Sequence, residues 1–168
     1  FGGEAASLVV DNDISITAQN VVTDEISTVA GNVTITADND ITIDAATGAA
    51  ATTDVSGSLT LTSANATASA ITTSGILKAD NDITITAADQ VSVAKVQTVV
   101  GSVAITAGNE INCATTASDI NNGSLTITST SAVAGAGNGF VNADVALVVD
   151  NDVTSTAAEI DAEAAITS

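Results

Sequence analysis

The feature that most restricts the fold of this chain is a short repeat that recurs along most of its 168 residues. The best copy, at residues 31–45, reads Gly-Asn-Val-Thr-Ile-Thr-Ala-Asp-Asn-Asp-Ile-Thr-Ile-Asp-Ala, and residues 101–114 match it without a gap. Partial copies begin at residues 7, 78 and 146, and two shorter copies begin at Gly57 and Gly123. Self-similarity at a period of roughly 20–50 residues is typical of solenoids and other repeat folds.

Apolar and polar residues alternate within each copy. Val33, Ile35 and Ala37 share one parity, whereas Thr34 and Thr36 take the other. A period of two over four or five residues indicates a half-buried strand, and no helical period accompanies it. The core has to be aliphatic, because the chain holds two Phe and no Trp, Tyr or Met. A thin core between stacked strands does not need large aromatic side chains.

Alignment of the copies gives two periods. The middle of the turn falls on Asn12, Asn39, Asn65, Asn81, Asn109, Ser131 and Asn151, with spacings of 27, 26, 16, 28, 22 and 20 residues, about 23 on average. The longer period is more regular, because Asn12 to Asn81 is 69 residues and Asn81 to Asn151 is 70. We therefore expect about seven coils, grouped in units of three coils and about 70 residues, at approximately 8–77, 78–146 and 147–168, the last one partial.

These patterns predict an all-β fold in which residues 1–168 form a single β-solenoid domain, with a right-handed parallel β-helix as the expected form. An antiparallel sandwich or barrel is the alternative, but hairpins do not require repeats of equal residues. A solenoid does, because each coil stacks on an almost identical one. Identical residues then form ladders, and the predicted turn ladder consists of Asn12, Asn39, Asn65, Asn81, Asn109 and Asn151.

The consensus Gly-Asn/Ser-apolar-Thr-apolar-Thr-Ala-x-Asn-Asp-Ile-Thr-Ile-x-Ala resembles the haemagglutinin-type repeats of large secreted bacterial adhesins, including filamentous haemagglutinin. The resemblance covers most of the chain. It implies a right-handed β-helix in an exported, rod-like protein that is extracellular or held at the cell surface. It brings no catalytic residues with it.

The charge is strongly one-sided. Twenty acidic residues stand against two Lys, with no Arg or His, which gives a net charge of −18. Nucleic acid and anionic membrane surfaces are not attracted by such a surface. The chain also lacks an apolar run long enough to cross a bilayer. We expect no nucleic-acid partner and no membrane insertion.

The Asp-Asn-Asp turns are the sharpest candidate sites. Asn and Asp cap their own turns and tolerate left-handed backbone, so one interpretation is plain turn chemistry. In the other, Asp11 lies over Asp38 and Asp13 over Asp40 in adjacent coils, and calcium bridges the paired carboxylates. Calcium is the only cofactor that the sequence suggests, and none is required. The candidate ligands are Asp11, Asp13, Asp38, Asp40, Asp80, Asp82, Glu110, Asp150 and Asp152.

Two other residue types need an interpretation. Cys113, the only cysteine, occupies the place of Ile43 and Ile85 in the aligned copies, so we expect it inside the core as a small apolar residue. Asn-x-Ser/Thr sequons begin at three positions and are candidate glycosylation sites. They are Asn32, Asn65 and Asn122.

Pairs of outward-facing threonines raise the idea of an ice-binding face, because flat threonine arrays on solenoids are found in some ice-binding proteins. The pairs are Thr34/Thr36, Thr60/Thr62, Thr84/Thr86 and Thr126/Thr128. Threonine also suits the solvent side of any strand. The array is expected to be broken, because residues 76–78 and 145–149 carry mainly aliphatic residues in the corresponding copies.

An enzyme is not expected. Solenoid enzymes that act on polysaccharides use basic and aromatic side chains, and the acid pairs of this chain all lie in repeated turns. The end coils look like ordinary repeat units with no polar cap beyond residues 1–7 and 161–168. We therefore predict a structural extracellular protein that stacks head-to-tail with its own copies into a fibre, with an unidentified host or surface ligand. The alternatives are an interior segment of a larger adhesin stalk, or a solenoid module that binds ice or calcium.

Overall fold

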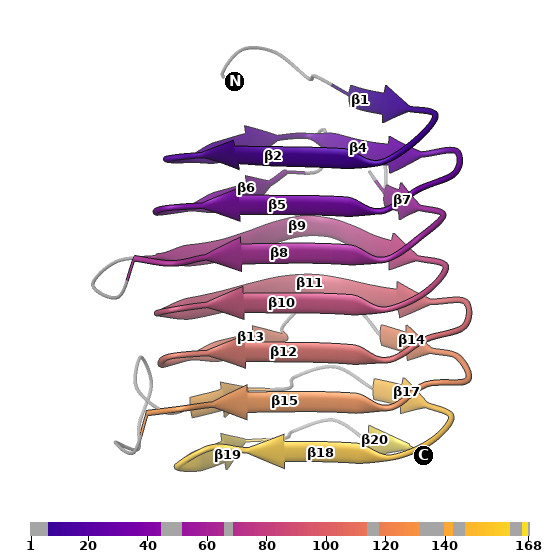
Figure 1. Ribbon diagram of the computed structural model, residues 1–168. Helices are drawn as coiled ribbons and strands as arrows, with labels where there is room; N and C mark the ends of the chain where they lie inside the picture. Colours follow the sequence, from indigo (N-terminus) through magenta and orange to yellow (C-terminus); the bar gives the residue numbers. More distant parts are fainter. Residues whose placement is uncertain are drawn as a thin grey trace.

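The computed structural model describes residues 7–44, 52–65, 69–113, 118–131, 140–142, 147–161 and 166–167. Every element in these ranges is a β-strand, and every strand pair is parallel. The chain winds into a stack of coils (Figure 1), which confirms the predicted β-solenoid. In this part of the chain, no helix is present that is long and apolar enough to cross a membrane.

Seven strands form one sheet, here called the front sheet (Figure 1), with one strand from each passage of the chain. They begin 19, 26, 24, 20, 22 and 28 residues apart, about 23 on average, although individual spacings differ from those of the sequence alignment. In chain order they are β2 (Ile14–Ala18), β5 (Val33–Ala37), β8 (Leu59–Ser63), β10 (Ile83–Ala87), β12 (Val103–Ala107), β15 (Leu125–Ser129) and β18 (Val153–Thr156).

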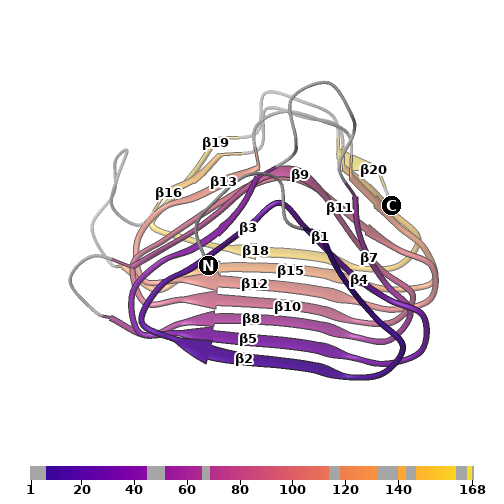
Figure 2. The same cartoon turned by 90° about the horizontal axis from the view of Figure 1, so that it is seen from above.

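The other strands form one hydrogen-bonded sheet that bends over two faces, because the long strands β9 (Ala70–Ala79) and β11 (Gln90–Thr98) cross both (Figure 2). The left face adds β3 (Val21–Thr23), β6 (Ile41–Ile43), β13 (Ile111–Cys113), β16 (Phe140–Asn142) and β19 (Glu159–Asp161). The right face adds β1 (Ser7–Val10), β4 (Glu25–Thr28), β7 (Thr52–Val55), β14 (Ser118–Ile120), β17 (Leu147–Val149) and β20 (Ile166–Thr167).

The cross-section is a rounded triangle with three corners (Figure 2). The first corner joins the right face to the front sheet, the second joins the front sheet to the left face, and the third joins the two back faces. Seen from the N-terminal end, the chain runs clockwise as it moves away from the viewer, so the solenoid is right-handed. This is the hand that parallel crossover connections almost always adopt.

The core fills the triangle with aliphatic side chains. Along β5, Val33, Ile35 and Ala37 point inward and are fully buried, whereas Thr34 and Thr36 point outward. The same alternation recurs on the back faces, where Ile41 and other inward residues complete the core. In the described residues the buried apolar side chains are all Ile, Leu, Val, Ala or Cys, as the composition predicted.

The three-coil repeat is visible in individual hydrogen bonds. The Thr28 hydroxyl donates to the Gly31 carbonyl over 3.0 Å, and 70 residues later the Thr98 hydroxyl donates to the Gly101 carbonyl over 2.9 Å. Both threonines are buried at the end of a right-face strand. The front-sheet strands β2, β10 and β18 begin 69 and 70 residues apart, in agreement with the longer sequence period.

Candidate functional site

The structure divides the Asp-Asn-Asp turns between two corners. Asp11–Asp13 lies at the first corner, where the amide of Ala30 donates to the carbonyl of Asp11. Asp38–Asp40 lies at the second corner, where the amide of Asp38 donates to the carbonyl of Ala18. The predicted stacking of Asp11 on Asp38 and of Asp13 on Asp40 is therefore wrong.

The single Asn ladder predicted from the sequence is wrong for the same reason. Asn12, Asn81 and Asn151 occupy the first corner, whereas Asn39, Asn65 and Asn109 occupy the second. Each motif forms a tight turn before or after a strand, and the turn chemistry is the same at both corners. Turns of the same sequence therefore lie at opposite ends of the front sheet.

At the first corner, asparagine alternates with pairs of glycines. The column contains Asn12, Gly31, Gly57, Asn81, Gly101, Gly123 and Asn151. The amide of Asn81 donates to the Gly57 carbonyl, and the amide of Asn151 donates to the Gly123 carbonyl. A Cβ atom added to Gly31 would lie 2.6 Å from the carbonyl carbon of Asn12. The three-coil period therefore consists, at this corner, of one Asn coil followed by two glycine coils.

The last residue of the first corner connects successive coils through its side chain. The carboxylate of Asp13 accepts a hydrogen bond from the Asn32 amide at 2.7 Å, and the Asn32 side-chain oxygen accepts one from the Ser58 amide at 2.9 Å. The carboxylate of Asp82 accepts a bond from the Ser102 amide at 2.8 Å. These contacts support the turn-chemistry interpretation of the acidic motifs, because the carboxylates accept hydrogen bonds from backbone N–H groups that take no part in strand pairing.

The bond between Asp82 and Ser102 gives a stability prediction. We expect Asp82→Ala to lower the free energy of unfolding in urea by about 1 kcal/mol, because it removes a charge-assisted bond to an amide of the next coil. Asp82→Asn keeps an acceptor and should recover most of this loss.

Asp80→Ala is the matched control, because Asp80 lies in the same corner and its carboxylate accepts no hydrogen bond in the described part of the chain. Equal effects of Asp80→Ala and Asp82→Ala would contradict a role for the Asp82 bond.

At the second corner, asparagine side chains bond to their neighbours along the stack. The side-chain amide of Asn65 donates to the side-chain oxygen of Asn39 at 2.7 Å, and that of Asn109 donates to the carboxylate of Asp89 at 2.6 Å. The carboxylate of Asp40 accepts a bond from the Ala70 amide at 2.9 Å. Stacked asparagines joined through their side chains are therefore found at this corner in the pair Asn39 and Asn65, a shorter ladder than the one predicted.

The candidate calcium ligands are not brought together. At the first corner, two glycine coils separate each acidic coil from the next, and the ligands there are Asp11, Asp13, Asp80, Asp82, Asp150 and Asp152. The second corner holds Asp38, Asp40 and Glu110. Among the described residues, no group of three or more acidic, Cys or His side chains is arranged to hold a metal ion. The calcium hypothesis thus loses the carboxylate pairs on which it was based.

Cys113 lies in the core, as predicted. Its side chain is buried, and burial raises the pKa of the thiol to about 12. The pairing through Val93 and Thr73 places Cys113 in the same left-face column as Ile43. The predicted equivalence of Cys113 with Ile85 is wrong, because Ile85 lies in the front sheet.

The three sequons differ in how their side chains are engaged. The amide nitrogen of Asn32 donates to Asp13 at 3.3 Å, and that of Asn65 donates to Asn39. These two nitrogens, which would carry a glycan, already serve the contacts between coils. Asn122 is exposed and has a left-handed backbone with φ of 55°.

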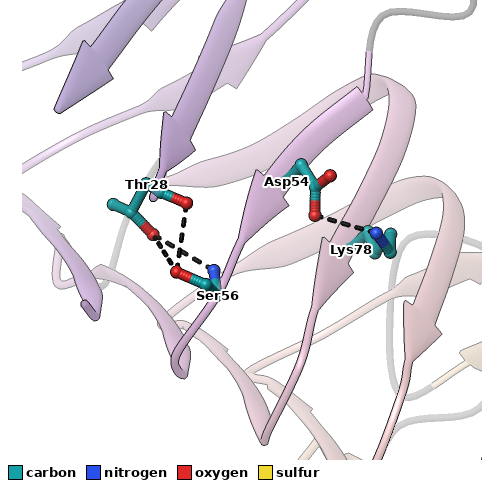
Figure 3. Close-up of polar contacts among 4 residues, drawn as sticks. All are labelled: Thr28, Asp54, Ser56 and Lys78. Atoms are coloured by element: carbon teal, nitrogen blue, oxygen red, sulfur yellow. Dashed lines mark hydrogen bonds and ion pairs between the residues drawn. The ribbon is translucent and has the colours of Figure 1, made fainter. Parts of the chain in front are cut away.

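Polar contacts on the right face join adjacent coils (Figure 3). Ser56 donates from its amide to the Thr28 hydroxyl and from its hydroxyl to the Thr28 carbonyl, each over 3.1 Å. Lys78 pairs with Asp54 at 3.0 Å, and both side chains are partly exposed, so solvent screening limits what this ion pair contributes.

The predicted threonine pairs all lie on the outer side of the front sheet. Strand pairing sets Thr34, Thr60, Thr84 and Thr126 in one column and Thr36, Thr62, Thr86 and Thr128 in a second. The predicted break in this array is wrong, because residues 76–78 and 147–149 belong to the right face. Sequence reasoning missed four further members, Thr17, Thr106, Thr154 and Thr156, which the alternation within their own strands would have indicated.

Comparison of the chain with known protein families, curated proteins and solved structures gives no match.

Proposed function

We propose that this chain is structural: a rigid length of β-solenoid rod, extracellular or at the cell surface, whose end coils stack on further coils. The resemblance of its repeat to haemagglutinin-type adhesin repeats supports this placement. The single observation that carries the proposal is that both end coils have uncovered core positions and, among the described strands, a front-sheet strand with one unpaired edge.

The uncovered core positions stand out against their neighbours in the same columns. Leu8 pairs with Ile26 in an inward-facing column, yet Leu8 is 38% exposed and Ile26 is 0% exposed. At the other end, Ile160 continues the column of Ile111, and these residues are 49% and 0% exposed. Each end therefore presents an apolar surface of the kind that adjacent coils bury elsewhere in the stack.

The end strands also have free hydrogen-bonding edges. Among the described strands, β2 pairs only with β5, and β18 pairs only with β15 (Figure 1). An unpaired edge is a template for a further strand. Because the two ends of a solenoid are different surfaces, contact between them is head-to-tail and does not close into a ring.

The proposal has two forms. In one, separate copies stack head-to-tail into a fibre; in the other, the solenoid continues as part of a longer adhesin stalk. In the first form β20, which already pairs with β17, competes with β1 of the next copy for the same position. In the second form β20 is simply the first strand of the following coil.

Charge opposes direct contact between copies. Stacking β2 of one copy on β18 of another would set Asp13 against Asp152 and Asp11 against Asp150, about 4.8 Å apart along the stack. Inside the solenoid such acidic coils are separated by two glycine coils. End-to-end association should therefore strengthen as salt screens these charges.

We expect light scattering after size-exclusion chromatography to show association that rises with protein concentration and with NaCl between about 0.01 M and about 1 M, where the Debye length falls from ~30 to ~3 Å. Negative-stain micrographs should then show thin filaments. A monomer at every concentration and salt level would overturn stacking of separate copies.

Ser15→Pro tests whether the β2 edge makes the contact. The Ile14 amide donates to Asn32 in the neighbouring coil, so the Ser15 amide points to the free edge, because successive amides of a strand alternate in direction. Proline at position 15 removes that donor without touching the pairing with β5. Ser15→Ala keeps the donor and is the matched control. Filaments that form equally well from both variants would contradict assembly through β2.

A further inference from the structure

The outer side of the front sheet is chemically uniform over all seven strands. Two columns of outward residues run along the stack, and twelve of their fourteen members are threonine. The first column is Ser15, Thr34, Thr60, Thr84, Ala104, Thr126 and Thr154, and the second is Thr17, Thr36, Thr62, Thr86, Thr106, Thr128 and Thr156. The second column is threonine without interruption.

The right face of the same solenoid shows that stacking alone does not produce this uniformity. Its central outward column, also built by parallel in-register pairing, consists of Val9, Ser27, Asp54, Lys78, Gln97, Asp119 and Val148. Strand preference for threonine acts on both faces equally. The repetition of threonine on the front sheet therefore requires a reason particular to that face.

The threonine hydroxyls of the two columns have no partner among the described residues. None of the twelve makes a side-chain hydrogen bond in the described part of the chain, whereas the hydroxyls of Thr28 and Thr98 bond to turn carbonyls. Every member is half-buried or exposed. The face also carries none of the chain's 22 charged residues, the 20 acidic residues and two lysines. It is a neutral patch on a protein of charge −18.

The geometry is that of a two-dimensional grid. Neighbouring threonines lie about 4.8 Å apart across strands and roughly 6.6 Å apart along a strand. The strands of the front sheet lie side by side in a single layer with little twist (Figure 1). Each threonine presents one hydroxyl, which donates and accepts hydrogen bonds, and one methyl group. A ligand that uses the whole grid has to be uncharged, able both to donate and to accept hydrogen bonds, and periodic in two directions.

We propose that the outer side of the front sheet, over the two threonine columns, binds the surface of ice. Ice is uncharged and periodic, each water donates and accepts hydrogen bonds, and the rows of oxygen atoms in hexagonal ice are separated by distances close to both grid spacings. The irregular surface of a globular protein does not match a grid of seven strands, and interfaces with proteins favour aromatic anchors, which the two columns lack. Crystalline polysaccharide is bound through aromatic platforms, which are likewise absent from these columns.

The proposal is tested by measuring thermal hysteresis and inhibition of ice recrystallisation with the full chain. We expect both activities in the wild type. Thr86→Tyr, in the middle of the unbroken column, should reduce hysteresis about tenfold at equal protein concentration, because one bulky side chain holds the flat face away from the flat ice surface.

Gln97→Tyr is the matched control, because it introduces the same side chain at an outward position in the middle of the right face. Gln97→Tyr should keep the wild-type activity, and circular dichroism should show both variants folded. No hysteresis in the wild type, or equal hysteresis in the two variants, would overturn the proposal. A change of oligomeric state in Thr86→Tyr without any wild-type hysteresis would instead identify the face as a contact between copies.

Discussion

Replacing Ile85 with alanine is expected to lower the free energy of unfolding by about 3–4 kcal/mol. Ile85 lies in the middle strand of the front sheet, is 0% exposed, and stacks between Leu61 and Ile105 of the adjacent coils. A solenoid core is thin, so the coils above and below cannot close the cavity without breaking their own register. Each repeat is stabilised mainly by contacts with its neighbours, so a cavity here weakens two interfaces at once.

Urea unfolding followed by circular dichroism measures the effect. Ile85→Val removes one methylene and should lower the free energy of unfolding by about 1 kcal/mol, so the loss of stability should increase with the number of atoms removed. Thr84→Ala changes the adjacent outward residue and should stay within about 0.5 kcal/mol of the wild type. If Ile85→Ala were no more costly than Thr84→Ala, the assignment of inward and outward positions in β10 would be wrong.

Adding a single methyl group at Gly101 is expected to destabilise the protein by about 3 kcal/mol, at the upper end of the range for overpacking. A Cβ atom there would lie 2.5 Å from the carbonyl carbon of Asn81 and 2.6 Å from its oxygen. These are backbone atoms of the neighbouring coil, so relief requires the two coils to separate locally. Hydrogen bonds of the first corner would then be lost with the packing.

The comparison variants for Gly101→Ala are Val100→Ala and Gly101→Asn. Val100 is the preceding residue and is exposed, so Val100→Ala should be close to neutral. Gly101→Asn would set an asparagine directly against Asn81, the stacking of asparagine on asparagine that the sequence suggested, and we expect it to destabilise the protein at least as much as Gly101→Ala. A stable Gly101→Asn variant would show that asparagine stacks on asparagine at this corner.

The local structure of this protein was predictable because it depends on neighbours in the sequence. Alternation of Val33, Thr34 and Ile35 specifies a strand with one buried side, and the structure contains that strand as β5. Cys113 was correctly placed in the core because its parity in the repeat is inward. The absence of large aromatic residues correctly indicated a thin aliphatic core.

The positions of the corners were not predictable in the same way. Asp11–Asp13 and Asp38–Asp40 are identical in sequence and are each followed by an apolar-polar-apolar strand. A turn needs only local backbone chemistry, so the same tripeptide serves the first corner in one coil and the second corner in another. Only the strand pairing of Ile14 with Val33, rather than with Ile41, distinguishes them.

The corner at which a turn lies decides which surface the following strand joins. When every Asp-Asn-Asp turn is placed at one corner, residues 76–78 align with the threonine strands and interrupt the array. Pairing places Leu77 on the inside of the right face and Lys78 on its outside, away from the front sheet. The acidic turns moved apart at the same time, and with them the expected calcium sites.

The repeat by itself therefore determined that the chain forms parallel strands stacked in coils with a three-coil period. Alternation of apolar and polar residues specifies each strand through local geometry, and similar residues in successive copies favour stacking because they form ladders. Only the tertiary structure decided which strand lies on which face and which turn lies over which, because these depend on hydrogen bonds between residues 18 to 30 positions apart. Coils of unequal length can satisfy the same local pattern in several registers. One register buries the inward columns between the two end coils and places glycine against asparagine at the first corner. The same register gathers the threonines into a single grid.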